Sequence, residues 1–202
     1  DVCSSDLTGT VVFKEEDISN MSTRNRRELG IGFIPEDRHR QALLLTAPLW
    51  ENHMLGHQTM APNSNGFMLT PGAAKDDTKR IVEEFDVRTP GIDVLASALS
   101  GGNQQKLIVG REMSGEPKLL IAAHPTRGID VGAQAAIWDH LRHAREAGLA
   151  VLLISADLDE LIGLSDSIKV LLRGAFVADA NPATVTPEQL GTAMTGAGKV
   201  SA

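Results

Sequence analysis

The chain has 202 residues, enough for one domain with a substantial core or for one core with a small subdomain. Hydrophobic residues make up 42% and charged residues 22%, as in ordinary globular proteins, and no apolar run is long enough for a membrane-spanning helix. The net charge of −7 and the aromatic content of 3%, with no tyrosine, argue against a nucleic-acid partner, so we expect a soluble protein of another class.

The first residues, 1–7, read DVCSSDL and resemble the translation of a sequencing-library adapter, so we expect them to be non-native. Residues 8–18 are rich in β-branched side chains and predict a strand that enters a hairpin or loop. A short polar helix is expected at residues 24–29, followed by a brief buried strand at residues 32–34. The next predicted element is a helix at residues 48–55, which tolerates Pro48 in its first turn.

The middle of the chain predicts a mostly helical segment from residue 43 to residue 115. A polar loop at residues 63–66 precedes a helix at residues 72–85. The spacing of its apolar residues places four of them on one face of this helix: Ala74, Ile81, Val82 and Phe85.

The last third has a different pattern, with unbroken apolar runs at residues 118–123 and 150–154 on either side of a helix at residues 133–147. A strand, a helix and a strand with such runs predict a parallel sheet that is buried on both faces. His140 and His143 lie on the helix between them, and we interpret them as part of a solvated face rather than as a zinc site. A short helix at residues 157–164, a hairpin from residues 168–172 and 175–178, and a helix at residues 186–194 complete the expected elements.

The most informative segment consists of Leu99, Ser100, Gly101, Gly102, Asn103 and Gln104. A serine and two glycines ahead of a helix leave backbone N–H groups free, with the positive end of the helix dipole behind them. This arrangement suits a phosphate, although a serine and two glycines in this place more often only cap a helix. The longer string LSGGNQQK resembles the signature motif of ABC-type ATPases, in the form found in importers of simple sugars and nucleosides.

The resemblance extends from residue 8 to about residue 196 and implies an α/β fold. This would be a partial P-loop NTPase (ABC ATPase) core with a mostly parallel sheet and an inserted helical subdomain. The core would comprise residues 8–42 and 118–196, the helical subdomain residues 43–117, and a tail residues 197–202. Motif by motif, the resemblance implies that Glu36 lies in the Q-loop, that Asp130 is the D-loop aspartate, and that Leu99 to Gln104 bind nucleotide.

The chain departs from the family pattern where catalysis is concerned. The Walker B motif should end in Asp-Glu, but the chain has Ala123 and His124, and the switch-loop histidine is replaced by Ala156. An alanine cannot hold Mg²⁺, whose charge is central to phosphoryl transfer, so a catalytic role for His124 is disfavoured. No GxxxxGK[ST] phosphate loop occurs in the 202 residues. We therefore expect no intact catalytic residue and no metal ligand, and the chain alone should neither bind ATP tightly nor hydrolyse it.

The resemblance also implies that the chain is the C-terminal half of an importer subunit. The full-length subunit would use ATP and Mg²⁺. Its place would be cytoplasmic and peripheral, on the inner face of the cell membrane. Its partners would be an N-terminal ATPase half of the same subunit, permease subunits in the membrane and, indirectly, a solute-binding lipoprotein. The form Ala122-Ala123-His124-Pro125 favours the nucleoside branch over sugars such as ribose.

In this interpretation Ser100, Gly101, Gly102 and Gln104 act in trans, at an ATP site on the other half. Two alternatives remain open: a non-transport ABC protein that acts on the ribosome or on DNA, and a structural half-domain with no nucleotide role. A core without its first strand and phosphate-loop helix is also expected to expose a sheet face and an edge, and thus to be poorly soluble alone.

Overall fold

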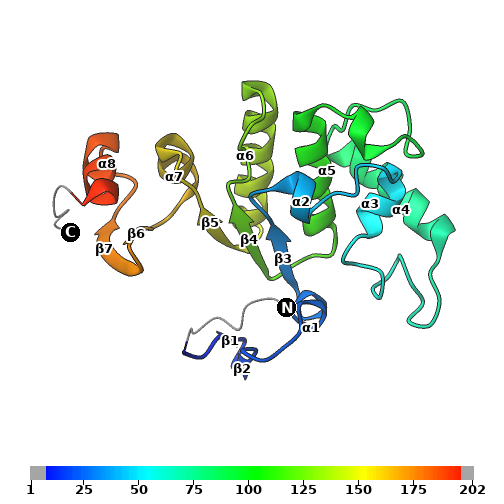
Figure 1. The fold of residues 1–202 in the computed structure, drawn as a ribbon, viewed down its shortest axis with the longest axis horizontal. Helices are drawn as coiled ribbons and strands as arrows, with labels where there is room; N and C mark the ends of the chain where they lie inside the picture. Colours follow the sequence, from blue (N-terminus) through cyan, green and yellow to red (C-terminus); the bar gives the residue numbers. More distant parts are fainter. Residues whose placement is uncertain (1–7, 197–202) are drawn as a thin grey trace.

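The computed structural model describes residues 8–196 (Figure 1), so the adapter-like leader at residues 1–7 and the tail at residues 197–202 lie outside the described residues. The centre of the molecule is a parallel sheet of three strands, β3 (Ile31–Ile34), β4 (Leu119–Ala123) and β5 (Ala150–Ile154), with β4 in the middle. α6 (Val131–Glu146) connects β4 to β5. The parallel strand–helix–strand unit expected from the two apolar runs is confirmed.

The sheet is covered on one face only within the described residues. On the covered face Ile34, Leu120 and Ala122 are fully buried and pack with residues of α5 (Gly101–Ser114) and α6. On the opposite face Phe33 and Leu152, which flank Ile121 in register, are 39% and 52% exposed. Within residues 8–196 the expectation of burial on both faces is therefore wrong, whereas the exposed sheet face expected of a core without its first strand and phosphate-loop helix is present. An apolar run indicates that a strand can be buried and not that a partner covers both of its faces.

The helical part lies at one end of the sheet (Figure 1). It comprises α3 (Leu49–Met54), α4 (Pro71–Glu84), the short 3-10 helix η1 (Ala96–Ala98) and α5. Ala74, Ile81 and Phe85 of the predicted apolar face are buried, and Val82 is partly buried against the same core. The sequence pattern did not predict α2 (Arg38–Gln41), which begins where the side chain of Asp37 accepts a hydrogen bond from the N–H of Arg40.

Two smaller parts flank this arrangement. Near the N-terminus, β1 (Val12–Phe13) and β2 (Glu16–Asp17) form the expected hairpin and α1 (Thr23–Glu28) follows it. At the other end, α7 (Leu158–Leu164), the antiparallel pair β6 (Ile168–Leu172) and β7 (Ala175–Ala180), and α8 (Pro187–Thr195) form a second small core. Within residues 8–196, no helix is both long and apolar enough to cross a membrane.

Candidate functional site

The candidate site lies at the carboxyl end of the parallel sheet. Because β3, β4 and β5 run in the same direction, the loops that follow them meet at one edge of the sheet, which is the usual place for ligands in such folds. These loops carry Glu36 after β3, His124 to Asp130 after β4, and Ala156 after β5. α5 packs against β3 and leads through residues 115–118 into β4, so its N-terminus lies beside the same loops.

The signature segment, Leu99 to Gln104, forms the start of α5. Ser100 is the N-cap, and its Oγ accepts hydrogen bonds from the N–H of Asn103 (3.4 Å) and from Nδ2 of Asn103 (3.0 Å). The expectation that both glycines precede the helix is wrong, since Gly101 and Gly102 already belong to its first turn. Their backbone N–H groups still have no acceptor within the helix, and the positive end of the dipole lies there, so the geometry suits an anion.

The other residues of the signature segment are engaged with the protein. Leu99 is buried in the core, and Oδ1 of Asn103 accepts a hydrogen bond from the N–H of Arg88 (2.9 Å). Gln104 is only 5% exposed. Its Nε2 donates to the carbonyl oxygen of Ala96 (3.0 Å), and its Oε1 lies 2.9 Å from Nε2 of His39. The structure therefore leaves exposed Ser100 and half-buried Gly101 as the part of the segment most open to a ligand, whereas Gly102 is buried against Asp130 and Ala133.

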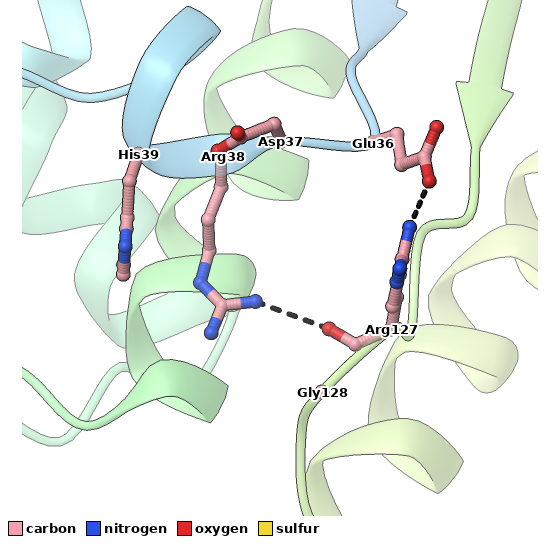
Figure 2. A pocket seen from close by; sticks show the side chains of 6 residues that line it. All are labelled: Glu36, Asp37, Arg38, His39, Arg127 and Gly128. Atoms are coloured by element: carbon pink, nitrogen blue, oxygen red, sulfur yellow. Dashed lines mark hydrogen bonds and ion pairs between the residues drawn. The ribbon is translucent and has the colours of Figure 1, made fainter.

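The segment after β3 is tied to the loop after β4. Glu36, the expected Q-loop residue, forms an ion pair with Arg127. Arg38 donates from Nη1 to the carbonyl oxygen of Arg127 (3.1 Å), as Figure 2 shows. A depression of about 520 Å³ lies between these groups, lined by Glu36, Asp37, Arg38, His39, Arg127 and Gly128. Sequence reasoning missed the roles of Arg38 and Arg127, because no spacing pattern connects residues so far apart in the chain.

The positions that correspond to the family's Walker B and switch-loop residues carry no carboxylate. Ala123 is the last residue of β4 and Ala156 is exposed in the loop after β5. His124 has a left-handed backbone (φ 48°), and its N–H donates to the carbonyl oxygen of Ile154 (2.8 Å), so it extends the strand pairing by one bond.

The carboxylates at this edge have other partners. Asp130 accepts a hydrogen bond from the N–H of Ala133 (3.0 Å) as the N-cap of α6, and this bond lowers the pKa of Asp130. Asp157 caps α7 in the same way, and Glu36 is paired with Arg127. Mg²⁺ beside a nucleotide is held by one or two carboxylates together with waters and phosphates, and the carboxylates at this edge are engaged as helix caps or in an ion pair, so the described residues do not fit this ion. No cluster of three or more His, Cys, Asp or Glu suited to a metal occurs among residues 8–196.

The two histidines on α6 lie in different surroundings. The ring of His140 stacks on that of Phe85 with centroids 4.2 Å apart, whereas His143 is exposed. The expectation of a solvated pair is thus wrong for His140, because α4 packs close enough to cover its ring.

Comparisons with known proteins identify relatives of this chain and the fold that it shares with solved structures. No family model matches the chain. The chain is 44% identical over 189 residues to the guanosine import ATP-binding protein NupO of Bacillus subtilis, and 42% identical over 189 residues to the nucleoside import ATP-binding protein NupA of Lactococcus lactis. Each alignment covers 94% of this chain but only 37% of the relative, so the chain spans about a third of the length of these proteins.

Among solved structures, the chain is similar to the ATP-binding cassette MJ0796, described as a dimer in a post-hydrolysis state bound to ADP and Pi. The TM-score is 0.71, and the match covers 87% of this chain and 74% of the other. At 17% sequence identity this similarity shows the fold alone, which is that of an ABC ATPase domain.

Proposed function

We propose that this chain, which has the fold of an ABC ATPase domain and is similar over 94% of its length to nucleoside-import ATP-binding proteins, completes an ATP site in an importer subunit. The substrate class that we propose is nucleosides, because both relatives compared above carry nucleoside substrates in their names. The proposed partners are a second ATPase half and permease subunits in the membrane.

The observation that carries the proposal is an asymmetry at one edge of the sheet. The N-terminus of α5 has the exposed Ser100 as its cap, and the N–H groups of Gly101 and Gly102 have no acceptor within the helix. The ends of β4 and β5, in contrast, carry Ala123 and Ala156, and the neighbouring carboxylates are occupied as helix caps or ion pairs. The chain can therefore supply donors for a phosphate but not the ligands for its metal ion.

This asymmetry favours action in trans. In the proposed mechanism the Ser100 hydroxyl and the N–H groups of Gly101 and Gly102 face the terminal phosphate of a nucleotide that the other ATPase half holds. The chemistry that a bound ATP and Mg²⁺ supply, cleavage of the terminal phosphoanhydride bond, then belongs to that half. Preorganised donors stabilise the charge that develops during the reaction, and one such donor contributes about 10²–10³ in rate.

A chimera tests the proposal. Residues 8–196 would replace the matching region of the Bacillus subtilis relative, and guanosine uptake would be measured in cells that lack the original protein. We expect the chimera to restore uptake. If the chimera is expressed at the level of the native relative and assembles in the membrane but supports no uptake, the proposed function is wrong.

A further inference from the structure

We propose that Arg38 is a positioning residue that holds the first turn of α5 against the loop after β4. Its guanidinium group lies between these two segments (Figure 2). Nε lies 3.4 Å from Oε1 of Gln104 in α5, and Nη1 donates to the carbonyl oxygen of Arg127 at 3.1 Å. A guanidinium group holds its donors in a rigid plane and can bind two acceptors in a fixed geometry, whereas the three donors of a lysine ammonium rotate freely.

The first glycine of the signature segment provides the space for this group. A Cβ on Gly101 would lie 2.8 Å from Nη2 of Arg38, so any larger residue there displaces the guanidinium group. Gly102 has a different neighbour, since its Cβ would lie 2.8 Å from the Cβ of Ala133 in α6. The two glycines therefore accommodate two different contacts, and only Gly101 is matched to Arg38.

The segment after β3 is attached to the same loop a second time through the ion pair of Glu36 with Arg127. His39 adds a further contact, at 2.9 Å from Oε1 of Gln104. A displacement of residues 36–39 is consequently transmitted both to the loop after β4 and to the first turn of α5. Arg38 thereby determines the orientation of the N–H groups of Gly101 and Gly102 at the start of α5. The importance of this orientation for ATP hydrolysis rests on the proposed function.

The test measures amide hydrogen exchange in the 202-residue chain. Arg38→Ala should increase the exchange rates of the Asn103 and Gln104 amides about two- to tenfold, the range expected for loss of one hydrogen bond. The amides of Ile108 and Val109, later in α5, should keep their rates. The control is Arg40→Ala, in the same short helix, whose exposed side chain makes no hydrogen bond or ion pair to another described residue. Unchanged rates at Asn103 and Gln104 would overturn the inference.

A double-substitution cycle separates positioning from a general loss of stability. Because Gly101→Ala displaces the Arg38 side chain, Arg38→Ala and Gly101→Ala together should increase exchange no more than either change alone. The matched control combines Arg38→Ala with Gly102→Ala, for which the effects should multiply. If the first pair also multiplies, the two residues are independent and the inference is wrong. If Arg38→Ala prevents folding, Arg38→Lys takes its place. This variant keeps the charge and the aliphatic chain but loses the simultaneous contacts with Gln104 and with the carbonyl oxygen of Arg127.

ATP hydrolysis by the chimera distinguishes this inference from the proposed function. If Arg38→Ala alters amide exchange but hydrolysis does not depend on Ser100, Arg38 positions the first turn of α5 and the proposed function is wrong. If hydrolysis depends on Ser100 and Arg38→Ala alters neither exchange nor rate, the proposed function stands and the inference fails.

Discussion

Gly102, in the first turn of α5, lies directly against Asp130, the N-cap of α6. A Cβ on Gly102 would be 3.0 Å from Oδ2 of Asp130. The signature segment and the expected D-loop, which are separated by the whole of α5 and β4 in the chain, therefore lie in direct contact. As a result, the positive ends of two helix dipoles meet at the carboxyl edge of the sheet.

The close packing of α5 makes a first prediction at Gly110. A Cβ at this position would lie 2.6 Å from Cγ2 of Ile81 and 2.9 Å from Cδ2 of Phe85. Gly110→Ala should therefore lower the free energy of unfolding by about 1–3 kcal/mol in urea denaturation, although alanine is the better helix former. Gly191 in α8 is the control, because nothing lies within 4 Å of its Cβ position. Gly191→Ala should raise the same free energy by about 0.4–1 kcal/mol. Stabilisation by both changes would contradict the packing seen around Gly110.

The buried ion pair of Arg111 with Glu112 gives a second prediction. Nε of Arg111 lies 2.9 Å from Oε1 of Glu112, and Nη1 donates to the carbonyl oxygens of Ala42 (2.8 Å) and Asn52 (3.0 Å). Arg111→Leu takes the donor from the carbonyl oxygen of Ala42 and from Oε1 of Glu112, although Arg27 still pairs with Oε2 of Glu112 at 2.7 Å. It should lower the free energy of unfolding by about 3 kcal/mol. In a chain of modest stability this amounts to loss of the cooperative unfolding transition.

The matched control for Arg111 is a solvent-exposed ion pair on the protein surface. Arg24 and Glu28 form an exposed pair within α1. Arg24→Leu should change the free energy of unfolding by less than about 1 kcal/mol. Equal effects of the two substitutions would show that Arg111 is not buried as described.

The third prediction concerns pH and His57. Burial lowers the pKa of this side chain to about 4, and the nearby charge of Glu112 opposes the shift only in part. An unfolded histidine has a pKa near 6.5, so between these two values the unfolded state binds a proton that the folded state does not. The free energy of unfolding should consequently fall as the pH decreases from 6.5 to about 4. At 1.36 kcal/mol per pH unit the contribution of His57 is about 3 kcal/mol.

Urea denaturation at pH 7 and pH 4.5 measures this contribution. The free energy of unfolding of His57→Gln should change less across this pH range than that of the wild type. His143→Gln, a change at an exposed position, should show the same change as the wild type. Identical slopes for wild type and His57→Gln would contradict the assignment. Because other groups also titrate in this pH range, the contribution of His57 is obtained from the difference between wild type and His57→Gln and not from the total decrease in the free energy of unfolding.

Local signals in the sequence were sufficient to predict most elements. Thr186 and Pro187 indicated the start of α8, and the structure shows a capping box there, with Thr186 and Gln189 bonded to each other's backbone. The apolar runs that became β4 and β5 indicated parallel pairing, which the register confirms. These predictions succeeded because caps and periodicity depend on neighbours within a few residues.

Contacts across the chain could not be predicted in this way. The bond from Arg38 to the carbonyl oxygen of Arg127 joins residues 89 positions apart, and no local pattern marks either of them as a partner. The same holds for the stacking of His140 on Phe85, which depends on how α4 and α6 approach each other. The signature segment could be found because its residues are consecutive, but the contacts of the Gln104 side chain with His39 and with the carbonyl oxygen of Ala96 depend on other segments.

ATP hydrolysis by the chimera shows whether this chain supplies phosphate donors or catalytic residues. Rates would be compared for the unchanged chimera, for Ser100→Arg and for His124→Ala. We expect Ser100→Arg to reduce hydrolysis about a hundredfold or more, the loss typical of a preorganised donor, and His124→Ala to leave the rate nearly unchanged. A large loss with His124→Ala and none with Ser100→Arg would place catalysis in this chain's own loops and contradict the account.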